Sequence, residues 1–226
     1  MKKTLLLDSF PTWYYTPCMI NWKIAKRNKT SQKKDYLIKT INSSILLDLT
    51  SFLEGITTEI LLEIIWIRNF KDEANSIYLN NVTRYLDTVV LKSSWRDTLN
   101  LLESITGNKV SDFVEPEVLK SINILFSFRN LLTHGLEIEI EYFEKDNKTF
   151  IDTNSKYKPI VQFLKEKKLL DLSFEPYLNS ANILSNAVID FFKENTYIFI
   201  GQLFPIVKDF DLEGLKGNFE DSLKIK

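Results

Sequence analysis

The sequence predicts a mainly α-helical fold, an antiparallel helical bundle with a β-hairpin inserted after one of its helices. Glycine and proline are scarce, at 6 each, and 44% of the residues are apolar while 26% are charged, which favours helices in a globular chain. Apolar residues also recur every three or four positions over long stretches, whereas one stretch alternates strictly. The length of 226 residues suits one domain with an embellishment, so we expect a single domain over residues 1–226.

An irregular segment is expected before the first helix. Residues 1–30 show no clear period and are rich in aromatic residues and turn formers, so we expect them to wrap the bundle without regular structure. From Lys33 to Asn69 an apolar seam keeps its phase for about ten helical turns. Ser51 and Glu54 match a capping box that would start a second helix, but the continuous seam favours one long helix.

A second helical pattern covers residues 80–106 and ends at Gly107, a residue that favours the left-handed conformation of a helix C-cap. Two alternatives are open for this pattern: one continuous helix, or two helices separated at Ser93 and Ser94. The next helix begins at Pro116, because the fixed φ of proline suits the first helical position.

The period changes from helical to alternating after this helix. The helix ends at His134, Gly135 follows, and the alternation begins at Leu136. Its apolar and acidic members are Leu136, Ile138, Ile140 and Tyr142, with Glu137, Glu139 and Glu141 between them. We expect a β-hairpin insertion over residues 136–165, whose first strand has one acidic, solvent-exposed side. The apolar stretch from residue 159 to 170 fits a third strand or a short helix.

The C-terminal part is expected to contain one more helix, from about Tyr177 to Phe204, and then a polar tail over residues 205–226. Cys18 is the only cysteine, so no intramolecular disulfide can form, which fits a reducing cytosol. The apolar stretches are too short or too interrupted to span a bilayer. We therefore expect a cytoplasmic protein without a membrane partner.

Charge limits how the chain can bind nucleic acid. The net charge of −1 excludes binding through an overall positive charge. One dense basic segment exists, with no acid before Asp35, and its cations are Lys23, Lys26, Arg27, Lys29, Lys33 and Lys34. Two interpretations are open: a solvated segment that leads into a helix, or an RNA-binding surface that holds phosphates.

The stretch FSFRNLLTHG places Arg129, Asn130 and His134 at the end of the helix that starts at Pro116. Asn130 and His134 are four residues apart and share a helix face, and the long side chain of Arg129 can reach across from about 100° away. His134, the only histidine, lies where the negative end of the helix favours a protonated imidazole. Together they are candidates for a catalytic site that acts on a phosphate.

This motif resembles that of the HEPN family (higher eukaryotes and prokaryotes nucleotide-binding), helical bundles in which an arginine, often followed by a polar residue, precedes a histidine near the end of a core helix. The resemblance covers roughly Lys33 to Phe204. It implies a metal-independent endoribonuclease of a toxin–antitoxin, abortive-infection or other antiviral-defence system. It further implies RNA as the substrate, a homodimer, and an antitoxin or another protein as a partner.

Within that resemblance, His134 is the general acid or base, Arg129 stabilises phosphate charge, and Asn130 orients the ring or the substrate. Attack by a 2′-hydroxyl needs one group to take its proton and another to protonate the leaving 5′-oxygen. One histidine cannot comfortably do both, so two copies facing each other across a groove would complete the site. The expected products are a 2′,3′-cyclic phosphate and a 5′-hydroxyl. The sequence has no His/Cys cluster with metal-ligand spacing, and we expect no cofactor.

Two other interpretations are open. Some members of the family have lost catalysis, so Arg129 and His134 could instead bind a nucleotide or a protein partner in a non-catalytic module. A cationic residue in the last helical turn is also a common capping device, and His134 would then only stabilise the helix end of an unrelated helical scaffold. The glutamates that follow the motif would repel phosphates unless they face away, and they could dock a basic partner.

Overall fold

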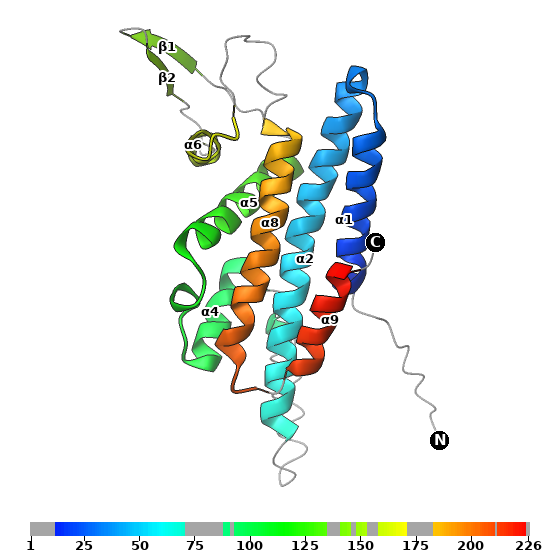
Figure 1. The fold of residues 1–226 in the computed structure, drawn as a ribbon. Coiled ribbons are helices and arrows are strands. Elements are labelled where there is room, and N and C mark those ends of the chain that lie inside the picture. Colours follow the sequence, from blue (N-terminus) through cyan, green and yellow to red (C-terminus); the bar gives the residue numbers. More distant parts are fainter. Residues whose placement is uncertain are drawn as a thin grey trace. The chain divides into compact units, whose positions relative to one another are not determined.

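The computed structural model describes residues 12–70, 88–90, 93–134, 141–145, 148–152, 158–170, 183–210 and 212–224. These residues are mainly helical, which confirms the mainly α-helical character of the predicted fold class. The long elements are α1 (Thr12–Lys29), α2 (Asp35–Phe70), α4 (Trp95–Thr106), α5 (Pro116–His134), α6 (Lys158–Glu166), α8 (Asn186–Leu203) and α9 (Glu213–Lys224) (Figure 1). Short 3₁₀ helices occur at Gln32–Lys34, Val110–Asp112 and Phe204–Val207.

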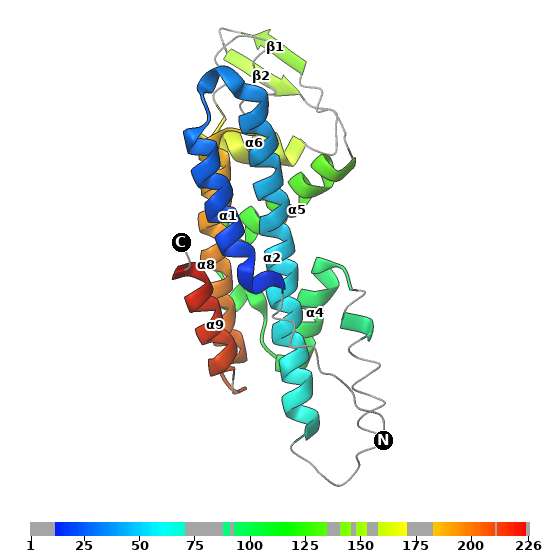
Figure 2. The ribbon, with the colours of Figure 1, turned by 90° about the vertical axis from the view of Figure 1, so that its right-hand side faces the viewer.

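Contacts divide the chain into two compact units. Unit 1 comprises Met1–Trp22, Ser51–Phe113 and Gln202–Lys226, and unit 2 comprises Lys23–Thr50 and Val114–Gly201. Within unit 2, the C-terminal half of α1, the N-terminal half of α2 and α8 lie side by side, as Figures 1 and 2 both show. Among the described residues, no helix has the length and apolar character needed to cross a membrane.

Helix α2 confirms the prediction of one long helix. It runs for 36 residues through the capping-box candidates Ser51 and Glu54 without a break. Its apolar seam has no exposed surface at Ile45, Leu46, Leu49, Phe52, Leu53, Ile56, Ile60, Leu61 and Ile64. The helix therefore continues through Ser51, because burial of so many apolar side chains outweighs the free energy that a new helix cap at this serine would contribute.

Helix α1 corrects the expectation of an irregular segment over residues 1–30. Residues 12–29 are helical, while residues 1–11 lie outside the described part of the chain. Its buried side chains are Trp13, Pro17, Ile20 and Arg27, which follow helical spacing on one face. A proline and an arginine occupy two of these positions, so a search for apolar periodicity could not recognise the helix.

Unit 1 has an aromatic core built around α1 and α2. The ring centroids of Trp13 and Phe52 are 6.3 Å apart, as are those of Phe52 and Phe219, and Phe204 lies 5.7 Å from Phe219. Trp13 packs against α2 at Gly55. A Cβ atom at Gly55 would lie only 2.9 Å from the Cβ of Trp13, so glycine permits the close approach of the two helices.

Gly55→Ala is expected to lower the free energy of unfolding by about 1–3 kcal/mol, because the added methyl group overpacks the contact with Trp13. Gly201→Ala and Gly217→Ala are matched controls, since both glycines are helical and a Cβ there meets nothing within 4 Å. Each control should raise stability by up to about 1 kcal/mol, because alanine favours the helix. Urea unfolding measures all three, and stabilisation by Gly55→Ala would contradict the close seating of α1 on α2.

Helix boundaries in the middle of the chain match the predictions where they are described, while the predicted start of the second helical pattern at residue 80 lies outside the described residues. Ser94 caps α4 and accepts a hydrogen bond from the Asp97 N–H at 3.3 Å, so the helical pattern is divided at the serine pair. Gly107 ends α4 with φ of 74° and donates its N–H to the Glu103 carbonyl. Helix α5 has the predicted bounds, Pro116–His134.

Two short strands follow α5 in the chain. β1 (Glu141–Lys145) pairs antiparallel with β2 (Lys148–Asp152), with Phe143 opposite Phe150. The predicted start of the first strand, at Leu136 to Ile140, lies outside the described residues. Over residues 136–140 the predicted hairpin insertion therefore stays a prediction. Residues 158–165, which were included in the predicted insertion, are helical and belong to α6.

The structure decides one open prediction in the C-terminal part and corrects another. The segment from residue 159 to 170, which fitted a third strand or a short helix, contains the helix α6, which buries Ile160, Val161, Phe163 and Leu164. Residues 205–226 are not simply a polar tail, because α9 forms there and Phe219 is only 4% exposed. The last main helix, α8, begins at Asn186, and residues 177–182 of its predicted range lie outside the described chain.

Candidate functional site

Helix α5 positions the Arg–Asn–His motif in unit 2. Its core side is held by Phe128 and Leu131, which are 1% and 5% exposed. The Phe128 ring meets the Phe192 ring of α8 edge to face, with 6.2 Å between centroids. These contacts fix the last turns of α5, so the polar side chains beside them have a rigid support.

The motif residues lie at the point where one side of α5 emerges from the core. Phe126 is buried, whereas Asn130 and His134, one and two turns further on, are exposed. Arg129 is half-buried, and its Nη1 donates to the Asn130 Oδ1 at 3.5 Å. The structure thus brings Arg129 and Asn130 together, and it places the His134 ring in solvent one turn after Asn130.

The backbone of the motif is stabilised by a neighbouring threonine. The Thr133 hydroxyl donates to the carbonyl oxygens of Arg129 and Asn130, at 3.0 and 3.2 Å. The hydrogen bonds that this hydroxyl donates go to backbone carbonyls, and none goes to the His134 imidazole. The arrangement can present a guanidinium, an amide and an imidazole to one phosphate group.

The exposed side of α5 carries Glu117 and Lys120 in its first turns and uncharged polar residues in the turns just before the motif. Asn123 is exposed and Ser127 is half-buried, and with Asn130 and His134 they form a stripe at helical spacing. The Ser127 hydroxyl donates to the Asn123 carbonyl at 3.0 Å. No carboxylate on this stripe repels a phosphate, and a second copy of the helix could approach it without burying a charge.

The cations of the predicted basic segment differ in exposure. Lys26, Lys29, Lys33 and Lys34 are exposed. Lys23 forms an ion pair with Asp48, and the Arg27 side chain is only 3% exposed. Arg27 is therefore corrected from an RNA-binding residue to a residue of the core, because its guanidinium is occupied inside unit 2.

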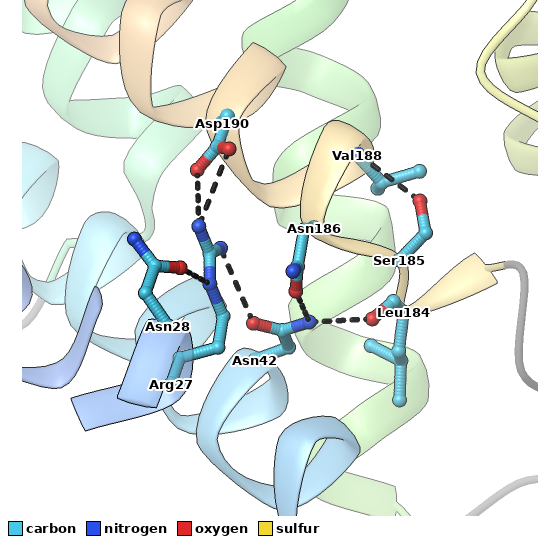
Figure 3. Close-up of polar contacts among 8 residues, drawn as sticks. All are labelled: Arg27, Asn28, Asn42, Leu184, Ser185, Asn186, Val188 and Asp190. Carbon is cyan, nitrogen blue, oxygen red and sulfur yellow. Dashed lines mark hydrogen bonds and ion pairs between the residues drawn. The ribbon is translucent and has the colours of Figure 1, made fainter. Parts of the chain in front are cut away.

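Arg27 is the centre of a polar network that joins α1, α2 and α8 (Figure 3). Its Nη2 donates to both carboxylate oxygens of Asp190, at 3.1 and 3.3 Å. Its Nε donates to the Asn28 Oδ1 at 3.2 Å, and its Nη1 donates to the Asn42 Oδ1 at 3.4 Å. A buried guanidinium is tolerated because a carboxylate and two amides satisfy it.

Asn42 extends this network to the start of α8. Its Nδ2 donates to the Leu184 carbonyl at 2.7 Å and to the Asn186 Oδ1 at 3.0 Å. Asn42 has no exposed surface, although it lies on the apolar seam of α2. Sequence reasoning missed this network, and the one available signal was an asparagine beside Ile41 on a mainly apolar helix face.

Unit 1 contains an acidic cleft of about 290 Å³, lined by Trp13, Glu59, Glu63, Leu212, Gly214, Leu215 and Asn218. Burial raises the pKa of Glu59 above its ordinary value, and the neighbouring Glu63 carboxylate raises it further. A carboxyl group whose pKa is raised by folding binds its proton more tightly in the native state. The native state therefore loses stability as the pH rises through the raised pKa.

Glu59→Gln is expected to raise the melting temperature at pH 7, because it removes a half-buried carboxylate that disfavours the folded state. The gain should shrink as the pH falls and vanish near pH 4 or below, at about the ordinary pKa of glutamate. Glu63→Gln should give a smaller gain, since Glu63 is exposed and contributes the lesser part of the shift. Thermal unfolding between pH 3 and pH 8 measures both, and a pH-independent effect would contradict this assignment.

Within the described ranges, no group of three or more His, Cys, Asp or Glu side chains could hold a metal ion. Comparison of the sequence and structure with protein-family models, with curated proteins and with solved structures found no match.

Proposed function

We propose that this protein is a metal-independent endoribonuclease of HEPN type that acts as a toxin or antiviral-defence effector. The observation that carries the proposal is the end of α5, where an exposed histidine follows an Arg–Asn pair that is already in contact. The resemblance of the stretch FRNLLTHG to the HEPN motif is the second support for the proposal. In the proposed fold, a β-hairpin is inserted into the helical bundle after α5.

Each motif residue has a role that its chemistry allows. The His134 imidazole can take and give a proton in general acid–base catalysis, and its exposure gives substrate access to the ring. Arg129 keeps its charge and offers a forked set of donors to the phosphate oxygens as negative charge develops. Asn130 can orient the substrate or the ring, but its amide cannot transfer a proton.

The reaction needs two proton-transfer groups. One His134 takes the proton of the 2′-hydroxyl as its oxygen attacks phosphorus, and a second His134 gives a proton to the departing 5′-oxygen. The products are a 2′,3′-cyclic phosphate and a 5′-hydroxyl. Since each chain has one histidine, the proposed active species is a homodimer whose interface includes the uncharged stripe of α5.

Ser127→Arg tests the dimer, because it places two like charges where the stripes of two chains would meet. The variant is expected to be monomeric in light scattering and to lose most RNA cleavage, while its melting temperature changes little. Lys216→Glu, an exposed charge reversal on α9 in unit 1, is the control and should leave both assembly and cleavage intact. A monomer that cleaves RNA at the full rate would overturn the dimer.

A non-catalytic nucleotide- or protein-binding module of the same fold is the second candidate. The observation that favours it is the acidic run after the motif, which continues into β1 at Glu141 and Glu144 and would disfavour phosphate binding. In that case wild type binds a nucleotide or a basic protein, His134→Ala does not, and neither cleaves any RNA.

A further inference from the structure

Four exposed lysines surround the turn between α1 and α2 in unit 2. They are Lys26 and Lys29 at the end of α1, and Lys33 and Lys34 in the 3₁₀ helix that follows. Tyr36, in the first turn of α2, is 71% exposed. We call these four lysines and Tyr36 the basic corner. Figure 2 shows this turn and the C-terminal end of α5 in the upper part of the view, both within unit 2.

The backbone of the basic corner is fixed by local hydrogen bonds. Ser31 caps the 3₁₀ helix: its hydroxyl accepts from the Lys33 N–H at 3.4 Å, and its carbonyl accepts from the Lys34 N–H at 2.9 Å. The Thr30 N–H donates to the Arg27 carbonyl at 3.0 Å. The lysines therefore project from a defined turn, which lowers the entropy that a ligand must remove.

Three acids in the described part of unit 2 pair with cations outside the basic corner. Asp35 pairs with Lys39 at 2.6 Å, Asp48 pairs with Lys23, and Asp190 pairs with Arg27. The sequence from residue 21 to 34 contains no acid at all. A near-neutral chain thus has a local excess of positive charge at this turn, and the positive end of the α2 dipole adds to it.

An exposed aromatic ring beside these lysines indicates which polyanion fits. Single-stranded nucleic acid offers both phosphates for lysines and unpaired bases that stack on aromatic side chains. A duplex keeps its bases stacked inside, and an acidic peptide has carboxylates but no bases. The combination of four lysines with one outward tyrosine therefore matches a single strand better than either alternative.

We propose that the basic corner binds single-stranded RNA, with phosphates on Lys26, Lys29, Lys33 and Lys34 and a base stacked on the Tyr36 ring. This inference rests on the proposed ribonuclease function and specifies the form of its substrate. The corner holds the strand, and the motif at the end of α5 cuts it. Lys23 and Arg27 take no part, because Asp48 and Asp190 engage them.

The test measures binding separately from cleavage. A fluorescein-labelled oligoadenylate of twelve nucleotides is titrated by anisotropy, over a range of salt concentrations, with full-length protein that carries His134→Ala so that the probe stays intact. Replacing the four lysines of the corner with Gln should weaken binding about tenfold or more and lower the salt slope by up to about 3, at 0.7 per phosphate contact. The matched control replaces Lys165, Lys168, Lys208 and Lys216 with Gln, four exposed lysines elsewhere that give the same change in net charge.

Tyr36 variants test stacking. Tyr36→Ala should weaken oligoadenylate binding by about 5- to 100-fold, the effect of losing one stacked base, while Tyr36→Phe should bind as well as the parent. Affinity for a duplex RNA of the same length should not change with Tyr36→Ala. Circular dichroism and melting temperatures establish that each variant is folded.

Three outcomes overturn the inference: equal losses in the corner variant and the lysine control, unchanged oligoadenylate affinity in Tyr36→Ala, or binding of a polyglutamate peptide in place of RNA. The last would identify the corner as a docking surface for acidic proteins. Oligoadenylate binding that depends on the corner, in a wild type that cleaves no RNA, supports the inference and overturns the ribonuclease. If cleavage depends on His134 but the corner variants do not change it, the ribonuclease proposal is supported and the inference about the basic corner is overturned.

Discussion

His134→Ala is expected to abolish RNA cleavage while leaving the fold intact. The imidazole is the one group of the motif that can both take and give a proton, because the Arg129 guanidinium stays charged and the Asn130 amide does not ionise, so no other motif residue replaces it. His134 is exposed, and its removal therefore leaves no cavity in the core. The measurement is the cleavage rate of a mixed RNA pool in EDTA, together with the melting temperature of each variant.

The other motif residues give a graded series. Arg129→Ala should reduce the rate by about 10²–10³-fold, the usual cost of removing one donor that stabilises transition-state charge. Arg129→Lys should recover part of this loss, because it keeps the charge without the fork. Asn130→Ala should be milder. Thr133→Ala is the control, since its hydroxyl bonds only backbone carbonyls.

The same series separates catalysis from helix capping. If His134 only stabilises the end of α5, His134→Ala lowers the melting temperature and leaves cleavage unchanged. His134→Gln sharpens the distinction, because glutamine can donate a hydrogen bond to the helix end but cannot act as an acid or base at neutral pH. An active His134→Gln variant would contradict the catalytic assignment.

Asp190→Asn is expected to lower the free energy of unfolding by about 2–3 kcal/mol. It leaves the Arg27 guanidinium buried without its carboxylate, and a buried charge without a partner is strongly destabilising. The estimate lies below the cost for a fully buried pair because the Asp190 side chain is 55% exposed and water reaches it. Urea unfolding at neutral pH measures the loss.

An exposed ion pair on unit 2 is the control for this prediction. Glu166→Gln removes the partner of Lys120, in a pair whose side chains are 48% and 59% exposed, and should cost less than about 1 kcal/mol. Arg27→Lys should destabilise the fold like Asp190→Asn, because lysine cannot reach three partners, while oligoadenylate affinity of the folded protein stays the same. Equal, small effects of Asp190→Asn and Glu166→Gln would contradict a structural role for Arg27.

The sequence predicted elements whose burial is carried by apolar residues at regular spacing. Helix α2 and both ends of α5 follow from this periodicity and from local signals such as Pro116. Helix α1 was missed because Pro17 and Arg27 lie on its buried face, and α9 was missed because Phe219 packs against aromatic residues distant in the sequence. Neither cause is visible in a local window.

In the candidate site too, local features were predictable from the sequence and long-range contacts were not. Arg129, Asn130 and His134 were recognised because they are neighbours on one helix, and local spacing fixes which face they share. The basic segment was recognised as a run of charges, but the Lys23–Asp48 ion pair and the burial of Arg27 within it were not. Arg27 binds Asn42 and Asp190, 15 and 163 residues away, and only the tertiary structure shows that its charge is already satisfied.

The chemistry of the product ends tests the central claim most directly. Wild-type protein and His134→Ala, each purified to the same standard, are incubated with a mixed RNA pool in EDTA, and the new ends are mapped. The ribonuclease proposal predicts 2′,3′-cyclic phosphate and 5′-hydroxyl ends with wild type and none with His134→Ala. Identical ends and rates from the two proteins would contradict it.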